Sequence, residues 1–284
     1  MQKAQLTLRP AEKKGTTTKR RKKKTQKRPL WQRIPKGVWI GMALMALVFA
    51  VLCYKFIGID SFSLRARFGE PIFPAGYVVR GIDVSHHQGE IEWERVRNAR
   101  IGGEPVAFAF IKATEGTDMV DPLFHRNISR ARRAELVVGA YHFFSPVSDP
   151  TQQAKLFIRN YALEEGDLPP VLDVEHANAN ITKEAFQRRV MTWLRVVEKE
   201  YGVKPIIYTG RNFKRDYLDA KEFDAYPLWL AHYYVKEMTY EGRWVLWQQT
   251  DRGEVPGIKG KVDCNLFNGD MNQFNKLIVK EDEK

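Results

Sequence analysis

The chain has 284 residues, of which 44% are hydrophobic and 12% aromatic, and this composition excludes wholesale disorder. The formal net charge of +12 is concentrated in residues 1–36, which carry 14 lysines and arginines and one acid, Glu12. A basic body that follows a nucleic-acid backbone is therefore excluded, and no nucleic-acid partner is expected. The cluster KRRKKK at 19–24 has the composition of a nuclear address or nucleic-acid arm, but beside an apolar segment it is better explained as a cytoplasmic topology determinant.

An apolar segment follows this tail: residues 37–54 contain no charge and, as a helix, span roughly 27 Å at about 1.5 Å per residue. A buried core helix is the alternative, but the segment has no polar face, and Trp39 and Tyr54 occupy interface positions. No small-x-small cleavage site follows it. We predict an uncleaved, single-pass signal anchor over residues 37–57, with residues 1–36 cytoplasmic and the rest of the chain outside.

Residues 58–76 contain two prolines and no sustained period, which is typical of a linker. Regular patterns begin after it and define a domain over residues 77–279, followed by a charged tail, 280–284. Short apolar or β-branched runs predict eight strands at 78–84, 106–113, 136–144, 170–175, 204–209, 228–233, 244–249 and 262–267. Helical patterns fill only the earlier gaps, at about 92–101, 122–134, 151–163, 182–201 and 211–220.

This order predicts an α/β fold: an irregular TIM-like barrel with five βα units followed by three strands, preceded by one transmembrane helix. An open doubly wound sheet is the alternative, but neither GxGxxG nor GxxxxGK[ST] is present to make it a nucleotide site. Cys53 lies in the apolar segment and Cys264 near the end of the chain, so no disulfide is expected.

Polar side chains recur near the ends of the predicted strands. They are Asp83, Glu115, Tyr141, His142, Asp173, Glu175, Tyr208, Gln248 and Asp263. Because the carboxyl ends of parallel barrel strands form the working face, we expect these residues to converge there.

The sharpest motif is Asp173-Val174-Glu175. Alternate strand residues share a face, so the two carboxylates lie about 7 Å apart at Cα. Two close carboxylates do not both ionise freely, and the one that keeps a proton can serve as a general acid. A lone pair of this kind could simply bind water or a lysine, but Asp83 and Asp263 favour the catalytic interpretation.

Aromatic residues lie in or beside the same strands, and flat amphipathic rings stack on sugars as readily as they fill a core. As a set they indicate a carbohydrate cleft: Tyr141, Phe143, Phe144, Tyr208, Trp229, Tyr233, Trp244 and Trp247. The histidines His86, His87, His142 and His176 lack a metal-type spacing such as HExxH, and no GxSxG elbow is present. We expect no metal and no cofactor.

Several ordered motifs resemble family 25 glycoside hydrolases. They are Gly81-Ile82-Asp83-Val84-Ser85, Phe110-Ile111-Lys112-Ala113-Thr114-Glu115-Gly116, Gly139-Ala140-Tyr141-His142-Phe143, Leu172-Asp173-Val174-Glu175, Ile207-Tyr208-Thr209, Leu228-Trp229-Leu230-Ala231, Trp247-Gln248 and Val262-Asp263. The resemblance covers about residues 77–279. It implies a lysozyme (N-acetylmuramidase) that cuts the β-1,4 bond between N-acetylmuramic acid and N-acetylglucosamine.

By the same resemblance, Glu175 is the general acid and then the base, and Asp173 orients the substrate's 2-acetamido group or acts as a nucleophile. Asp83 and Asp263 match two further active-site aspartates. The residues expected to bind substrate are Tyr141, Tyr208, Trp229, Gln248 and Glu115.

These inferences combine into a lysozyme anchored in the inner membrane, with its catalytic domain on the periplasmic side, acting on peptidoglycan glycan strands as a monomer. Two alternatives stay open. One is a catalytically silent peptidoglycan-binding protein, and the other is an endo-N-acetylglucosaminidase.

Overall fold

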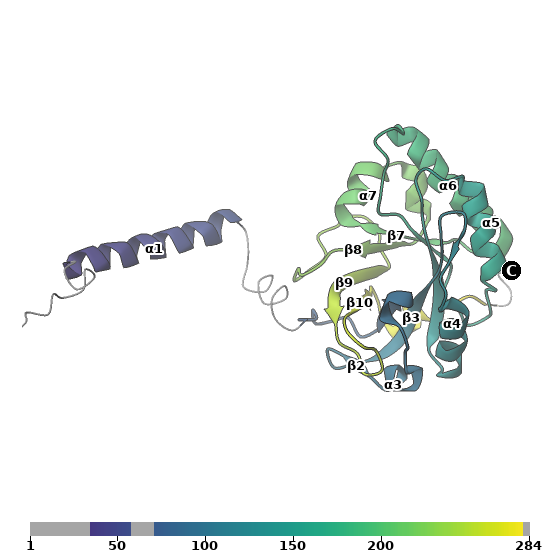
Figure 1. Cartoon of the computed structure of the whole chain (residues 1–284), viewed down its shortest axis with the longest axis horizontal. Helices are drawn as coiled ribbons and strands as arrows, with labels where there is room; N and C mark the ends of the chain where they lie inside the picture. The colour runs from purple at the N-terminus through teal and green to yellow at the C-terminus, as the bar shows by residue number, and fades with distance from the viewer. Residues whose placement is uncertain (1–34, 58–70, 281–284) are drawn as a thin grey trace, which may run out of the picture. The chain divides into compact units, whose positions relative to one another are not determined.

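The computed structural model describes residues 35–57 and 71–280 (Figure 1). The predictions for residues 1–34, 58–70 and 281–284 lie outside the described residues. The chain divides into two compact units, residues 1–58 and 59–284. The first unit contributes helix α1 (Lys36–Ile57), which is long and apolar enough to cross a membrane and has a mean hydropathy of 2.2 over Lys36–Tyr54.

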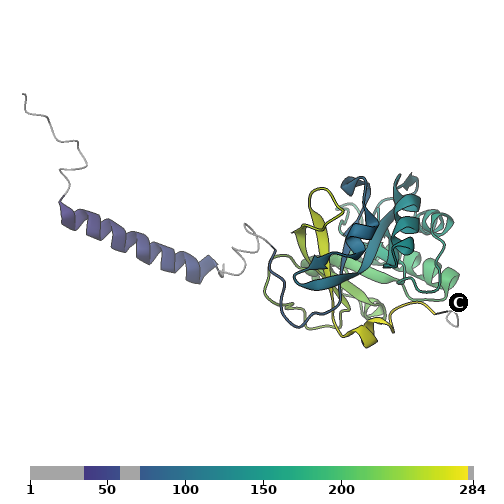
Figure 2. The same ribbon diagram turned by 90° about the horizontal axis from the view of Figure 1, so that it is seen from below.

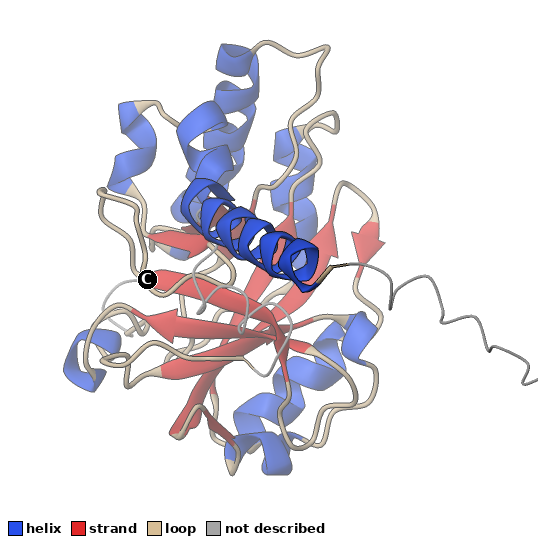
Figure 3. Ribbon diagram, turned by 90° about the vertical axis from the view of Figure 1, so that its left-hand side faces the viewer, coloured by secondary structure: helices blue, strands red, loops and turns tan. Residues whose placement is uncertain are grey.

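The second unit is built on a closed barrel of eight strands. They are β1 (Arg80–Val84), β3 (Glu104–Glu115), β5 (Val137–Phe143), β6 (Val171–Asp173), β7 (Ile206–Gly210), β8 (Leu228–Ala231), β9 (Leu246–Gly253) and β10 (Val262–Phe267). The strands from β1 through β3 to β9 pair in parallel, and β10 runs antiparallel to both β9 and β1. The β1–β3 pairing closes the ring, which confirms the predicted barrel. Figure 3 shows the strands in red at the centre of this unit, with its helices around them.

Five helices connect the first six barrel strands and pack outside them (Figures 1 and 2). They are α3 (Trp93–Arg97), α4 (Phe124–Arg133), α5 (Pro150–Asn160), α6 (Lys183–Tyr201) and α7 (Arg211–Tyr217). The last strands follow one another without a comparable helix, as predicted. Short turns complete the fold: η2 (His86–Gln88), η3 (Lys221–Ala225) and α8 (Met271–Phe274).

Local sequence explains where the helices begin. Asp149 caps α5 by accepting a hydrogen bond from Gln152 N at 2.8 Å, and Pro150 occupies the first turn, where its missing N–H costs nothing. Thr182 caps α6 in the same way.

The predicted helix at 92–101 is shorter in the structure. Gly102 and Gly103 adopt positive φ angles of 54° and 96° and turn the chain into a small hairpin. Strands β2 (Arg100–Ile101) and β3 form that hairpin, and β4 (Met119–Val120) pairs with the far end of β3. Neither β2 nor β4 is predicted from the sequence pattern.

The interior of the barrel is filled at one end by aromatic rings. Phe110 stacks on Trp229 at 4.7 Å between ring centroids, and Phe108 contacts Phe110 edge-on. Gly81 and Gly139 make room for these rings, since a Cβ at either position would lie within 2.5 Å of a phenylalanine ring carbon. A larger apolar layer lies between the barrel and its helices. Because these rings fill one end of the barrel, space for a cavity remains at the other end, where the strands have their carboxyl ends.

Residues 71–76, which we expected to belong to the linker, pack against the barrel. Gln249 Nε2 donates to Ile72 O at 3.0 Å, and the Arg80 guanidinium lies 5.3 Å from the centroid of the Phe73 ring. Next to them, Tyr77 meets Trp247 edge-on at 5.7 Å. The packed part of the second unit therefore includes residues 71–76.

Candidate active site

A cavity of about 290 Å³ opens at the carboxyl ends of the barrel strands. Eight of the nine predicted site residues line it, and Glu115 does not. The full lining consists of Asp83, Val84, Ser85, His87, Gln88, Lys112, Tyr141, Phe143, Asp173, Glu175, Tyr208, Trp229, Tyr233, Gln248 and Asp263. Residues up to 180 positions apart in the chain thus come together because each lies near the carboxyl end of a barrel strand.

Asp83 lies near the end of β1 and is 7% exposed. Its Oδ2 accepts two amide hydrogen bonds, from Gln248 Nε2 at 2.8 Å and from Asn265 Nδ2 at 2.8 Å. Burial raises the pKa of Asp83 to about 6, the two amide donors lower it, and the charge of Glu175 raises it. Burial and neighbouring charge thus outweigh the two amide donors.

Gln248 holds Asp83 in a fixed orientation because both ends of its amide are engaged. Its Oε1 accepts hydrogen bonds from the hydroxyls of Tyr208, at 2.6 Å, and Tyr233, so its NH₂ group is directed at Asp83. Gln248 is 3% exposed and sits on β9, which β8 separates from β7 and its Tyr208. Hydrogen bonds of this one side chain thus connect three barrel strands, β1, β7 and β9.

Asp173 ends β6, and Glu175 follows two residues later, so the two carboxylates reach the same cavity. Asp173 is 7% exposed, whereas Glu175 is exposed. Burial raises the pKa of Asp173 well above its usual range, and the charges of Glu175 and Asp83 raise it further, while Lys112 opposes them. Burial and the two neighbouring charges thus keep a proton on this pair of carboxyls.

One oxygen of Asp173 has no partner within the protein. Its Oδ1 is buried and accepts no hydrogen bond from any residue in the described ranges. An unsatisfied buried acceptor is costly, so a bound ligand that donates an N–H or O–H to it gains more than it would at an exposed oxygen.

Asp263 faces Asp83 directly in the antiparallel register of β10 and β1. Burial raises the pKa of Asp263 to about 9, with further increases from the charges of Asp83, Asp251 and Glu175. Four carboxyl groups therefore share one small cavity, and their mutual repulsion keeps part of them protonated near neutral pH.

Lys112 supplies a positive charge to this acidic cavity. Its Nζ lies 2.6 Å from Glu115 Oε2 and 4.9 Å from the centroid of the Phe143 ring. Glu115, predicted to bind substrate, is placed behind Lys112 and holds the ammonium group. Lys112 itself lines the cavity and is 8% exposed.

The predicted aromatic set divides in two. Five of its members line the cavity: Tyr141, Phe143, Tyr208, Trp229 and Tyr233. Trp229 is only 2% exposed and stacks on Phe110, so it forms the floor of the cavity rather than a free platform. The other three do not line it: Phe144 packs against Phe186, and Trp244 and Trp247 both pack against Tyr77.

Two of the four predicted histidines, His86 and His142, have structural partners, whereas His87 lines the cavity. His86 Nδ1 lies 2.8 Å from the buried Asp121 Oδ2. His142 is fully buried, with Nδ1 2.7 Å from Thr114 Oγ1 and Nε2 3.1 Å from Gln153 Oε1. Across residues 35–57 and 71–280, no group of three or more His, Cys, Asp or Glu side chains is arranged to hold a metal ion.

Asn265 is the functional neighbour that the sequence analysis missed. It is fully buried and donates to Asp83, and it lies two residues beyond Asp263 on β10. Because alternate strand residues share a face, the identification of Asp263 already implied that Asn265 points to the same side.

Comparison with known proteins agrees with this architecture. The model of glycosyl hydrolases family 25 matches residues 82–258. The uncharacterized protein YegX of Escherichia coli (strain K12) is 44% identical over 231 residues, covering 80% of this chain and 82% of its own. Lysozyme M1 of Streptomyces globisporus is 36% identical over 205 residues, covering 67% of this chain and 68% of its own.

Among solved structures, a family 25 glycosyl hydrolase from Bacillus anthracis superposes with a TM-score of 0.68 at 32% identity, covering 75% of this chain and 99% of that one. A closed α/β barrel with a cluster of carboxyl groups at its strand ends is an arrangement that glycoside hydrolases use, and the family match assigns this chain to that class. The chain belongs to glycosyl hydrolases family 25, as its motifs predicted.

Proposed function

We propose that the protein is a lysozyme that hydrolyses the β-1,4 bond between N-acetylmuramic acid and N-acetylglucosamine in peptidoglycan. The main support is the pairing of Asp173 and Glu175 in a cavity that Asp83 and Asp263 also line. Its similarity to Lysozyme M1 supports the substrate class.

In this proposal Glu175 is the general acid. It is the exposed member of the pair, so it can reach the glycosidic oxygen of a polymer lying across the cavity. Glu175 gives its proton to that oxygen as the bond to C1 breaks, and afterwards takes a proton from the water that attacks C1.

Asp173 acts on the sugar unit whose C1 is attacked. Its buried Oδ1 lacks a donor among the described residues, and the N–H of a 2-acetamido group is a donor of the required kind. Accepting that N–H would orient the acetamido oxygen towards C1, which favours the substrate-assisted route over direct attack by a carboxylate. Within the pair, the positive charge of Lys112 acts against protonation of Asp173, so Glu175 can carry the retained proton as the general acid.

The bond that is cut can be identified from the new reducing ends. Digestion of intact peptidoglycan with the protein, borohydride reduction and mass spectrometry should yield reduced N-acetylmuramic acid. Glu175→Gln should abolish it, and Glu165→Gln, which changes an exposed acid outside the cavity, should not. Reduced N-acetylglucosamine would assign a glucosaminidase instead, and binding without new ends would favour the silent peptidoglycan-binding alternative.

We also propose that α1 anchors the enzyme in the inner membrane, with the barrel on the periplasmic side. The support is the length and hydropathy of α1 together with the 14 basic residues in positions 1–36. Carbonate-washed membranes should retain the full chain and lose a variant without residues 1–57. Protease added to spheroplasts should degrade the barrel, and protection of the barrel would reverse the orientation.

A further inference from the structure

A second cavity, of about 440 Å³, is formed by chain segments that also contribute to the catalytic cavity. It is lined by Arg211, Lys214, Arg215, Asp219, Asp224, Thr239, Tyr240, Glu241 and Gly242. The same two chain segments frame both cavities. Strand β7 supplies Tyr208 to the catalytic cavity and continues directly into Arg211, and the segment after β8 supplies Tyr233 and then Tyr240.

The charges of this second cavity are of both signs, and several are already neutralised. Lys214 is buried and donates to Leu218 O at 2.6 Å, with Asp224 Oδ1 at 3.5 Å. Asp219 accepts hydrogen bonds from Lys183 Nζ at 2.5 Å and from Gln187. These groups form the walls and leave little charge for a ligand.

Arg211 is the exception. Its terminal nitrogens reach Asn212 Oδ1 at 3.4 Å and Thr239 O at 3.5 Å, both at the limit of hydrogen bonding. Its Nε is buried and has no acceptor within the described ranges. A guanidinium group held in this way presents a planar set of donors that matches a carboxylate.

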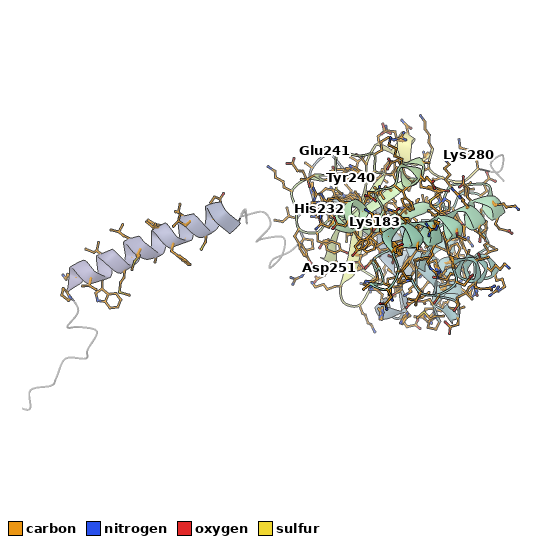
Figure 4. The ribbon with its side chains drawn as sticks, turned by 90° about the horizontal axis from the view of Figure 1, so that it is seen from above. Lys183, His232, Tyr240, Glu241, Asp251 and Lys280 are labelled. Carbon is orange, nitrogen blue, oxygen red and sulfur yellow. The ribbon has the colours of Figure 1, made fainter. Side chains whose placement is uncertain are left out.

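Glu241, which also lines this cavity, is exposed and makes no ion pair with any residue that the structure describes. Its neighbour Tyr240 is half-buried, and Gly242 leaves room for the Tyr240 ring, since a Cβ there would lie 2.5 Å from a ring carbon. Figure 4 shows Tyr240 and Glu241 projecting at the edge of the barrel unit. The cavity therefore offers one unsatisfied cation, one free anion and an aromatic surface.

These features fit a short peptide that carries both a carboxylate and an amine. We infer that the second cavity binds the peptide attached to muramic acid, with Arg211 donating to a peptide carboxylate and Glu241 accepting from its amine. This inference rests on the proposed lysozyme function, because the peptide branches from a sugar held in the catalytic cavity. Binding of the peptide in the second cavity makes the enzyme selective for glycan strands that still bear peptides.

The test compares kcat/KM on peptide-bearing glycan strands with kcat/KM on strands stripped of peptides by an amidase, using the full chain in detergent. Arg211→Gln should reduce the ratio of the two values about tenfold, chiefly through KM on the peptide-bearing strands. Arg195→Gln is the matched control, since Arg195 pairs with Glu222 on the exposed surface and lines neither cavity. Unchanged melting temperatures would verify folding.

A ratio that Arg211→Gln leaves unchanged would overturn the inference while the lysozyme assignment stands. If the wild type cuts neither substrate, the lysozyme proposal fails, and calorimetric titration with a free wall tripeptide decides about the cavity. Binding that weakens at least fivefold in Arg211→Gln supports the peptide site, and absence of binding to the wild type rejects it.

Discussion

The side-chain amide of Gln248 donates to Asp83 Oδ2 at 2.8 Å while its carbonyl oxygen accepts from the hydroxyls of Tyr208 and Tyr233. The tyrosines determine which way the amide points, and the amide stabilises the ionised form of Asp83. Because burial pushes the pKa of Asp83 up to about 6, the amide donors decide how much of it is ionised near neutral pH.

Gln248→Met should therefore impair the enzyme most at low pH. The change keeps the side-chain volume but removes a donor to Asp83, so the pKa of Asp83 rises and the acidic limb of kcat/KM should move up by about one pH unit. Gln249→Met is the control, because Gln249 donates to Ile72 O and lines no part of the cavity. Identical acidic limbs in the two variants would mean that Gln248 does not tune Asp83.

The role of Asp173 can be separated from that of a nucleophile. If its Oδ1 accepts the acetamido N–H, a thiazoline analogue of N-acetylglucosamine should inhibit competitively, and Asp173→Asn should weaken that inhibition. The same variant should lose about 10²–10³ in kcat, since one carboxyl oxygen becomes an NH₂ donor and the negative charge is removed. Trapping of a glycosyl group on Asp173 by a fluorinated substrate would instead establish the carboxylate route.

Asp263 should lower the stability of the protein at alkaline pH. Its pKa is raised from an ordinary value near 4 to about 9, so the folded state retains a proton that the unfolded chain has released. This contribution to stability is fully present below about pH 4 and is lost as the pH rises towards 9.

Asp263→Asn removes the ionisation and should raise the melting temperature by roughly 3–8 °C at pH 8, with no gain at pH 4, while reducing activity. Thermal melts between pH 4 and 9 provide the measurement. Asp118→Asn, an exposed aspartate outside the cavity, should melt like the wild type at each pH. A gain at pH 8 no larger than the gain at pH 4 would contradict the pKa argument.

Much of the site could be predicted because it follows strand ends. Asp83 and Asp263 lie 180 residues apart, yet both were assigned to the barrel mouth from their positions in short apolar runs, and the structure pairs them in register. The order of five βα units followed by three strands could be predicted because no helical pattern separates the strands after residue 220.

The sequence could not show which face of a strand is inside the barrel, because both faces of these strands are buried and both are apolar. Trp229 and Trp247 therefore looked alike, although one lines the cavity and the other packs outside it. The sequence also could not show that Glu115, although it ends β3, pairs with Lys112 Nζ at 2.6 Å and does not line the cavity.

His142 should make the protein sensitive to acid in the opposite sense to Asp263. Gln153 uses its NH₂ group on Ser145 O and Ser148 O, so its oxygen must accept from His142 Nε2, and Thr114 donates to His142 Nδ1. Both ring nitrogens are thus satisfied only in the neutral form. Burial lowers the pKa of His142 to about 4, and the charge of Lys112 adds to the decrease.

A histidine whose folded pKa lies below its unfolded value of about 6.5 contributes stability that is present above that value and lost as the pH falls to 4. The full change is on the order of 3 kcal/mol in the free energy of unfolding. His142→Gln should be less stable than the wild type at pH 7 but should converge with it as the pH approaches 4. Denaturant unfolding at pH 7, 5.5 and 4.5 measures this, with His125→Gln as the exposed control. A constant difference between His142→Gln and the wild type over that range would show that His142 acts through packing alone.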